Sequence, residues 1–336
     1  MEIYQSAVDY ALTLPIIKSW PELQALLHKA ASRKPRHWEL PLKACQAIGG
    51  SADQAIPAIT AIACAQISII LIDDLLDKDP RGEYHRQGPA KVANYAAAFQ
   101  AASLEALSLQ RTKCARSLSG VLNLNRAIFL TAFGQHLDIQ NSLNEQAYWK
   151  IVEAKSAPFF GTAFYHGALS GGAPNRVARQ FERLGRLYGE MIQIHDDLND
   201  TMATPAGPDW TQKRLPLPIL FAQIVDHPER ARFIELFQNA EETEALSEAQ
   251  DILIRSGAIS YCVDQLIRRH QAAQRVLDTT AVAHPEFVRQ LLDEIIAPVQ
   301  NLFYSLGTPF QQTPLCREFW PVRRDDTQLP RFGNGS

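Results

Sequence analysis

Apolar residues recur at intervals of three and four along most of this chain, with polar residues between them. This spacing places the apolar side chains on one face of a helix. The alternation of apolar and polar residues that marks a half-buried strand is scarce, and no Asn-Gly or Asp-Gly turn joins strand-like runs. Proline and glycine interrupt the helical pattern at residues 35, 49–50, 80–89, 171–174 and 205–208. The pattern predicts an all-α bundle of about ten or more helices.

The helical pattern continues to about residue 306, so we predict a single all-helical domain over residues 1–306. Residues 307–336 are rich in proline and arginine and are predicted to form an irregular tail. Gln135 and Asp138 interrupt an apolar helix face, which we interpret as a hydrogen-bonded polar pair in the core. The predicted helical regions include one or two helices in 1–30, two long helices in 90–140, an amphipathic helix over 179–200 and packing helices in 228–306.

Two apolar helical segments end in groups of aspartates with the same spacing, DDLLD and DDLND. The first group consists of Asp73, Asp74 and Asp77, and the second of Asp196, Asp197 and Asp200. The first and last aspartates of each group are four residues apart and share one helix face. Like charges in such a group repel unless they are solvated or neutralised, most simply by a divalent cation. One group alone could be a solvated helix end, but two groups with the same spacing favour a metal site.

Basic residues occur where an anionic ligand would need them, although each also has an ordinary explanation. Arg33, Lys34 and Arg36 form either a solubilising loop or a clamp for phosphate oxygens. The polar loop at residues 80–88 carries further cations close to the first aspartate group. Lys155 stands alone among small and aromatic residues, where a lysine usually extends to solvent.

The composition is that of an ordinary soluble globular protein, with 46% hydrophobic and 21% charged residues among 336. The formal net charge of -3 gives no general attraction to nucleic acid or to an anionic membrane. Five cysteines are scattered without a CxxC pair, which fits reduced intracellular thiols. The N-terminus lacks a signal pattern and no apolar run of 18 residues occurs. We therefore predict a cytoplasmic protein without a membrane span.

Taken together, these motifs resemble those of the trans-isoprenyl diphosphate synthases, also called polyprenyl synthetases. The resemblance is detailed from about residue 33 to 225 and continues more loosely to about 305. Besides the two aspartate motifs, it includes the basic group at 33–36, the Gly-Gly turn at 49–50, Lys155-Ser156, the approach to the second motif through Gly189-Glu190 and Gln193, and Lys213 before Leu215-Pro216.

The resemblance implies an isoprenoid synthase-type helical bundle around a central cavity, with the two aspartate motifs facing each other at its mouth. It implies about three Mg²⁺ ions, replaceable by Mn²⁺, with Asp73, Asp74, Asp77, Asp196 and Asp200 as metal ligands. An allylic diphosphate would ionise there, and the double bond of isopentenyl diphosphate would attack the resulting cation. The catalytic residues that it implies are Asp73, Asp74, Asp77, Lys155, Asp196 and Lys213.

The same resemblance implies how the two substrates are bound and how the chain assembles. Lys155, Lys213 and Arg86 would hold the allylic diphosphate, and Gln193 would also bind substrate. The residues implied for isopentenyl diphosphate are Arg33, Lys34, Arg36 and Gln66. Members of the family are commonly homodimers, so a homodimer is expected.

The sequence departs from the family pattern mainly on the acceptor side. Gln87 stands where the family has the second arginine of an Arg-Arg-Gly motif, and losing one charged hydrogen bond costs about 1.5–3 kcal/mol. A class I terpene synthase, a prenyltransferase with another acceptor and a non-catalytic subunit of a heteromeric synthase therefore stay open as alternatives. Ser68 and Ala65, before the first motif, leave room where shorter-chain members have an aromatic floor. This predicts products longer than farnesyl diphosphate, of roughly C20 or C25.

Overall fold

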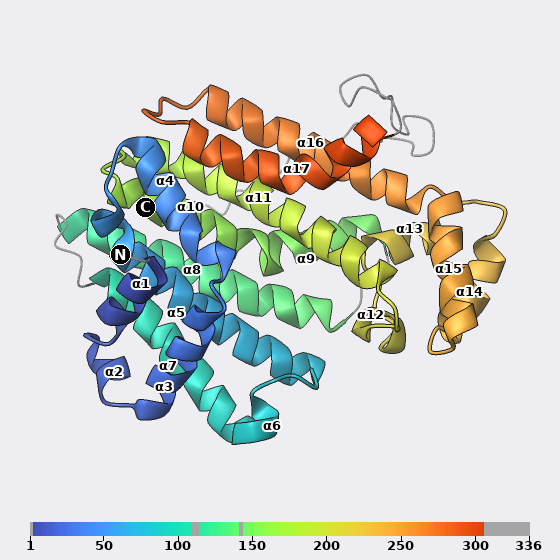
Figure 1. Ribbon diagram of the computed structural model, residues 1–336, viewed down its shortest axis with the longest axis horizontal. Helices are drawn as coiled ribbons and strands as arrows, with labels where there is room; N and C mark the ends of the chain where they lie inside the picture. Colours follow the sequence, from blue (N-terminus) through green and yellow to red (C-terminus); the bar gives the residue numbers. More distant parts are fainter. Residues whose placement is uncertain (1–2, 109–113, 141–143, 306–336) are drawn as a thin grey trace, which may run out of the picture.

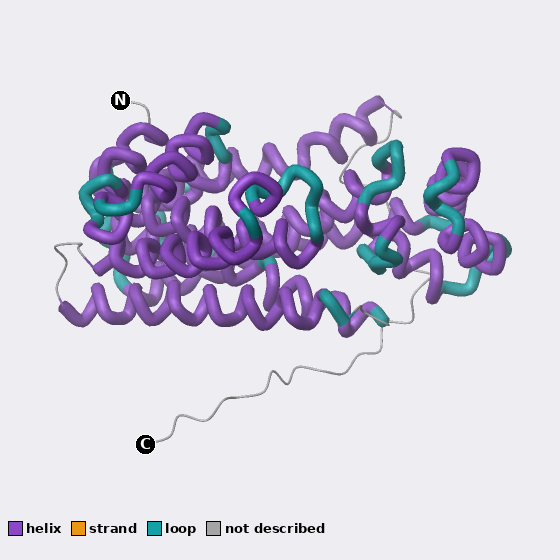
Figure 2. Tube along the Cα trace, turned by 90° about the horizontal axis from the view of Figure 1, so that it is seen from below, coloured by secondary structure: helices purple, strands orange, loops and turns teal. Residues whose placement is uncertain are grey.

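The computed structural model describes residues 3–108, 114–140 and 144–305, and every regular element in these ranges is a helix (Figures 1 and 2). This confirms the predicted all-α fold. The helices are α1 (Ile3–Ala11), α2 (Pro15–Lys18), α3 (Pro21–Ser32), η1 (Arg36–Glu39), α4 (Leu40–Ile48), α5 (Ala52–Asp77), α6 (Tyr84–Gln87), α7 (Pro89–Ser108), α8 (Cys114–Asp138), α9 (Glu145–Lys155), α10 (Ala157–Ser170), α11 (Asn175–Met202), α12 (Pro208–Thr211), α13 (Leu217–Ile224), α14 (Arg230–Gln238), α15 (Thr243–Arg255), α16 (Ala258–Asp278) and α17 (Glu286–Ser305).

The predicted helical regions agree with this arrangement except near the N-terminus. The two long helices predicted within 90–140 correspond to α7 and α8, and the helix predicted over 179–200 is the greater part of α11. The region 1–30 contains three helices rather than one or two, because Pro15 and Pro21 each start a new helix. The predicted tail lies outside the described residues, and the domain boundary at 306 stays a prediction.

Helix α10 is the centre of the bundle. Every residue from Ala157 to Ala168 is buried, and α4, α5, α8 and α11 all pack against this helix. Gly185 and Gly189 of α11 lie against the backbone and ring of Phe160, where a Cβ atom would collide. Close packing of α10 and α11 therefore fixes the position of the second aspartate motif at the end of α11.

Helix α5 carries the first aspartate motif and crosses the core. It starts at a capping box formed by Ser51 and Gln54, and it ends at Asp77, after which Lys78 adopts a left-handed conformation with φ 54°. By length and composition alone α5 could cross a membrane, which corrects the expectation that the sequence holds no such segment. However, 61% of its most apolar window is buried inside the bundle, as in the core helix of a soluble protein.

The N-terminal helices α1 to α3 and the pair α14–α15 lie at opposite ends of the bundle (Figure 1). The long helices run between these ends, and α16 and α17 lie together along one side. The ends of α5, α8, α9 and α11 bring their polar residues to one region, where the candidate site is found.

Candidate active site

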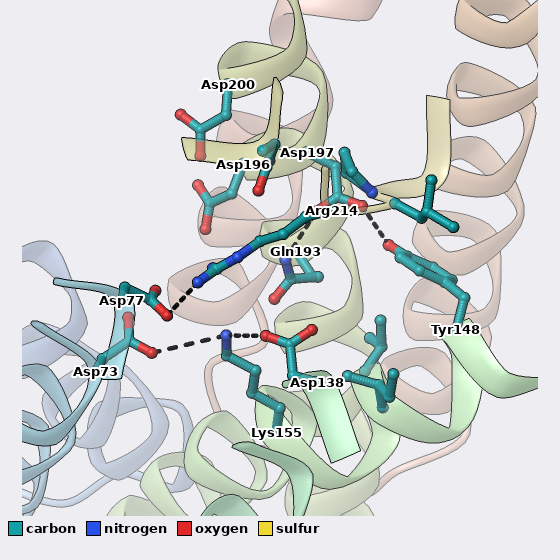
Figure 3. A pocket seen from close by; sticks show the side chains of 15 residues that line it. Asp73, Asp77, Asp138, Tyr148, Lys155, Gln193, Asp196, Asp197, Asp200 and Arg214 are labelled. Atoms are coloured by element: carbon teal, nitrogen blue, oxygen red, sulfur yellow. Dashed lines mark hydrogen bonds and ion pairs between the residues drawn. The ribbon is translucent and has the colours of Figure 1, made fainter. Parts of the chain in front are cut away.

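A cavity of about 290 Å³ opens where the ends of α5, α8, α9 and α11 meet the loop before α13. Both aspartate motifs contribute to its wall, as Figure 3 shows. Two cations, Lys155 and Arg214, reach into the space between the motifs. The carboxylates lining this cavity are Asp73, Asp77, Asp138, Asp196, Asp197, Asp200 and Asp209. Seven carboxylates against two cations leave an excess of negative charge that favours a bound cation.

In the first motif, Asp73 and Asp77 face this cavity from the last turn of α5. Asp73 accepts a hydrogen bond from Gln135, and its Oδ1 lies 3.7 Å from Nζ of Lys155. Burial raises the pKa of Asp73, and the opposing effect of Lys155 is smaller. Asp74 points to the other side of the helix end and lines a second cavity.

In the second motif, the three aspartates divide into two kinds. Asp196 and Asp200 are open to the cavity, and within the described part of the chain neither accepts a hydrogen bond or forms an ion pair. Burial and the neighbouring Asp200 raise the pKa of Asp196 to about 6. The two open carboxylates are available to a metal ion.

Asp197 is buried and its hydrogen-bonding capacity is used by the protein. It accepts from the Tyr148 hydroxyl at 2.7 Å, the Leu217 backbone N–H at 2.8 Å and Gln193 Nε2 at 2.8 Å. Burial nevertheless raises its pKa to about 6. Asp197 therefore ties α9 and α13 to α11 and orients Gln193, whose Oε1 accepts from Ser156 at 2.5 Å.

Lys155 is the last residue of α9, and its ammonium lies inside the cavity instead of extending to bulk solvent. Its Nζ is 2.6 Å from Asp138, and this carboxylate and Asp73 raise the pKa of Lys155 although burial opposes them. Gly134 of α8 makes this arrangement possible, because a Cβ atom there would collide with the backbone of Lys155. The interpretation of Gln135 and Asp138 as a core polar pair is therefore wrong, since they bind Asp73 and Lys155.

The structure does not bring Lys213 to this cavity. Its Nζ donates to the backbone carbonyls of Phe237 and Gln238 at 2.7 and 3.0 Å. The neighbouring Arg214 lines the cavity instead, and its Nη2 lies 2.5 Å from Oδ1 of Asp77.

A second cavity of about 280 Å³ lies on the other side of the α5 end, beside α3 and α6. Arg33 and Gln66, which were predicted to bind isopentenyl diphosphate, line it together with Arg86. Arg86 was predicted to hold the allylic diphosphate, but it does not line the first cavity and lies with the residues predicted for isopentenyl diphosphate. Lys34 and Arg36 are exposed and do not line either cavity. The first motif thus stands between two cavities, with Asp73 and Asp77 facing one and Asp74 the other.

Polar contacts hold the residues of the second cavity in place. Gln66 accepts from Trp38 Nε1 at 2.7 Å, and its amide nitrogen lies 3.0 Å from Nδ1 of His37. Glu83 pairs with Arg86 at 2.5 Å and with Lys29 at 2.6 Å. Lys29, on α3, is a cation of this cavity that the sequence motifs did not indicate.

Several lining residues could not be singled out from the sequence. Asp209 faces the first cavity, where burial, more than the nearby Asp197, raises its pKa to about 7. Tyr148 contributes its hydroxyl to Asp197. Arg81 lies in the second cavity and is close enough to Asp200 to affect its pKa. The sequence shows that these polar residues are present, but only the folded structure shows which of their side chains point into a cavity.

The residues fit a divalent metal in the way that Mg²⁺ is usually bound. Among the described residues, no three His, Cys, Asp or Glu side chains are gathered closely enough to hold a metal by themselves. Mg²⁺ is commonly bound by one or two carboxylates together with substrate phosphates and water, so a ready-made cage is not required. Asp196 and Asp200, which form no hydrogen bond or ion pair with any residue of the described ranges, provide such a carboxylate pair.

Comparison with known proteins points to one family. A family model described as polyprenyl synthetase matches residues 34–253. A geranylgeranyl diphosphate synthase of Methanosarcina mazei is 25% identical over 254 residues, which is 70% of this chain and 76% of that protein. A short chain isoprenyl diphosphate synthase of Methanothermobacter thermautotrophicus is 26% identical over 247 residues, covering 66% and 73% of the two chains.

Solved structures show the same fold at lower identity. The geranylgeranyl pyrophosphate synthetase of Pyrococcus horikoshii superposes with a TM-score of 0.75 at 18% identity, covering 87% of this chain and 95% of the other. The decaprenyl diphosphate synthase of Rhodobacter capsulatus gives a TM-score of 0.75 at 17% identity and covers 88% and 95%. Proteins named for different product lengths thus share this bundle.

Proposed function

This chain belongs to the polyprenyl synthetase family, and from that premise we propose that it condenses an allylic diphosphate with isopentenyl diphosphate to give a longer prenyl diphosphate. The observation that carries the proposal is the meeting of two aspartate motifs across one cavity, with Lys155 between them. A diphosphate placed there would be held by cations on several sides, as its departure from carbon requires.

We assign the first cavity to the allylic diphosphate and the second to isopentenyl diphosphate. Mg²⁺, with Mn²⁺ as a substitute, would be held in the first cavity by Asp73, Asp77, Asp196 and Asp200 and would offset the charge that develops on the leaving diphosphate. Asp74, which was also predicted to be a metal ligand, lines the second cavity instead. Lys155 stays charged in spite of burial and is placed to donate to the same diphosphate. Gln193 is fixed by Ser156 and Asp197, so its position is set before substrate arrives.

The second cavity suits a small diphosphate ester with an apolar tail. Arg33 and Arg86 offer guanidinium groups for the diphosphate, while Ile67 and Leu71 offer apolar surface. The first motif separates the two cavities, so the two substrates would approach from opposite sides of the α5 end. The proton released after attack would pass to the departing diphosphate.

We propose a product of about C20. Ala65 is buried and Ser68 is half-buried on α5, one to two turns before Asp73, and both side chains are small. A growing prenyl chain would extend past them into the bundle. Relatives named geranylgeranyl diphosphate synthase support this length.

We also propose a cytoplasmic homodimer. Leu118, Leu122, Phe129 and Phe133 are exposed on one side of α8 and border a groove of about 1360 Å³. An apolar face of this extent is typical of a surface covered by a partner. Cys45, Cys64 and Cys262 are free and buried, which fits a reducing compartment. Phe129→Glu should yield a monomer by light scattering, whereas a monomeric wild-type protein would contradict the homodimer.

The deciding experiment is product analysis with purified protein, Mg²⁺ and an allylic diphosphate of each length from dimethylallyl to geranylgeranyl, with and without isopentenyl diphosphate. Elongated diphosphates that require both substrates and disappear with EDTA support the proposal. Hydrocarbons formed without isopentenyl diphosphate would instead indicate a terpene synthase, and inactivity with every primer would contradict the proposal.

A further inference from the structure

Helix α9 carries Lys155 at its last position, so the placement of this helix decides where the ammonium lies in the first cavity. Two consecutive residues connect α9 to other helices. The Tyr148 hydroxyl donates to Asp197 of α11 at 2.7 Å (Figure 3). The next residue, Trp149, contacts Arg269 of α16, which lines neither cavity. Any effect of Arg269 on the first cavity must therefore pass through the residues that it contacts.

Arg269 joins α9 to α11 through a single guanidinium group. The guanidinium carbon lies 3.8 Å from the centre of the Trp149 ring, in a close cation–π contact. Nε donates to Glu190 at 2.8 Å, and Nη1 donates to Gln265 Oε1 at 2.8 Å. The side chains of Arg269 and Glu190 are 15% and 17% exposed, so their ion pair is largely shielded from solvent. Because a guanidinium is planar, its edge binds these partners while its face covers the indole.

Glu190 shares a face of α11 with Asp197, because the two carboxylates are seven residues, or about two turns, apart. Tyr148 ties α9 to Asp197 at one level of this face. Trp149 ties α9 to Glu190 at the other level, with Arg269 between them. Burial raises the pKa of Glu190, and the positive charge of Arg269 opposes this rise. The ion pair is therefore the contact that keeps a charged carboxylate at this position.

The indole of Trp149 is fixed at its N–H as well as at its face. Its Nε1 donates at 2.9 Å to Glu145, the first residue of α9, which also accepts from the Tyr261 hydroxyl of α16. The Tyr261 ring stacks on Phe221 of α13, with ring centroids 4.9 Å apart. An indole held in this way cannot shift along the guanidinium without moving α9. The contact with Arg269 thus sets the position of the helix.

We propose that Arg269 is a positioning residue for the reaction, which holds α9 against α11 and thereby fixes the Lys155 ammonium opposite the second aspartate motif. The inference rests on the proposed function, because it takes a diphosphate to be the ligand that Lys155 meets. Misplacing a binding group by about 1 Å can cost a large factor in rate, so a side chain outside the cavity can control catalysis inside it.

The neighbouring Arg268 provides a matched control, because it is exposed and its ion pair, with Asp264 at 2.5 Å, lies within α16. Binding of inorganic diphosphate with Mg²⁺ is measured by calorimetry for wild type, Arg269→Leu and Arg268→Leu, together with kcat and the melting temperature. Arg269→Leu should weaken binding and lower kcat about tenfold each, the effect of losing one charged hydrogen bond from a misplaced Lys155. Arg268→Leu should change either quantity by less than about twofold.

A double variant separates positioning from a general loss of stability. Lys155→Gln alone should weaken diphosphate binding about tenfold or more. If Arg269 acts through Lys155, adding Arg269→Leu to Lys155→Gln should weaken binding by less than about twofold further, although the melting temperature still falls. A full second loss of affinity would overturn the inference, and so would wild-type binding and kcat in Arg269→Leu.

The outcomes also separate this inference from the proposed function. If wild type binds diphosphate but elongates no primer, the proposed function fails, and the binding measurements still decide the role of Arg269. If wild type does not bind diphosphate with Mg²⁺, both fail. Should Arg269→Leu not fold, Trp149→Leu breaks the same link from its other end and keeps the pair with Glu190. This variant should weaken binding about tenfold, and wild-type affinity would overturn the assignment.

Discussion

Asp196 and Asp197 are neighbours on α11, and both have a pKa raised to about 6, mainly by burial. Even so, we expect alanine substitutions at the two positions to change the stability of the metal-free protein in opposite directions. Asp196 is open to the cavity and has no hydrogen-bond donor within the described residues, whereas Asp197 accepts from three donors. The comparison tests whether the second motif separates a metal-binding carboxylate from a structural one.

For Asp196, the pKa rises from 3.8 to about 6. Because a raised carboxyl pKa means that the folded state binds the proton more tightly than the unfolded chain, the resulting destabilisation appears as the pH rises through 6. In a fully buried group the shift would correspond to about 3 kcal/mol at pH 8, and solvent screening at this open position reduces it to about 1 kcal/mol. Alanine adds about 0.5 kcal/mol of helix propensity. Asp196→Ala should therefore raise the melting temperature by roughly 2–4 °C.

For Asp197, removal of the carboxylate leaves the Tyr148 hydroxyl, the Leu217 N–H and one Gln193 N–H without an acceptor. A buried donor without a partner costs about 1–3 kcal/mol. Alanine also removes the cost of ionising a buried carboxylate, which is about 3 kcal/mol for this pKa shift. The free energy of unfolding should therefore fall by about 2–3 kcal/mol in total. Asp197→Ala should lower the melting temperature by roughly 5 °C.

Calorimetry in EDTA at pH 8 measures both effects, and the same scans at pH 5 should show a smaller advantage for Asp196→Ala because wild-type Asp196 is then protonated. Mg²⁺ with inorganic diphosphate should raise the melting temperature of wild type and have little effect on Asp196→Ala. If Asp196→Ala melts at or below wild type in EDTA at pH 8, Asp196 is not a strained, unpaired carboxylate and our reasoning about the motif is refuted.

Three further predictions concern catalysis, product length and pH. Lys155→Gln should lower kcat/KM for the allylic substrate about a hundredfold in steady-state assays, because the diphosphate loses a fixed cation; an unchanged value would remove Lys155 from the site. Ser68→Phe should shorten the products seen by chromatography, and unaltered products would mean that the growing chain does not pass Ser68. Asp209 has a pKa of about 7, so metal-free wild type should lose stability as the pH rises through 7. Asp209→Asn should remove this dependence of the melting temperature, and an unchanged slope would assign it to other groups.

The helical fold and the shared helix face within each motif were predictable because they depend on short-range regularity, whereas the facing of the two motifs was implied only by the family resemblance. Residues four apart share a helix face wherever the helix is regular, so Asp73 with Asp77, and Asp196 with Asp200, had to point together. The cavity that joins them follows from two apolar helices that both end at the same side of the bundle. In these regions the spacing of residues in the sequence directly predicts which side chains share a helix face.

Contacts between helices were harder to predict from the sequence. Gln135 and Asp138 look like a core pair in the sequence because they interrupt an apolar face, but Gly134 lets α8 approach Lys155 so closely that they become part of the site. Tyr148 and Leu217 meet Asp197 from elements 49 and 20 residues away. No local pattern encodes such approaches, which depend on the packing of whole helices.

The basic residues show most clearly where the spacing of residues in the sequence no longer predicts the direction of their side chains. In the described residues, the non-glycine positions with positive φ are Lys34, Lys78 and Lys213, each at the end of a helix. Lys34 and Lys213 were both expected to hold diphosphate, yet neither lines a cavity, while the adjacent Arg33 and Arg214 do. A left-handed residue reverses the chain, so side chains one position apart diverge and a motif aligned by residue type can point the wrong member inward. Where a motif crosses such a turn, the residue next to the expected one should be mutated first when ligand binding is tested.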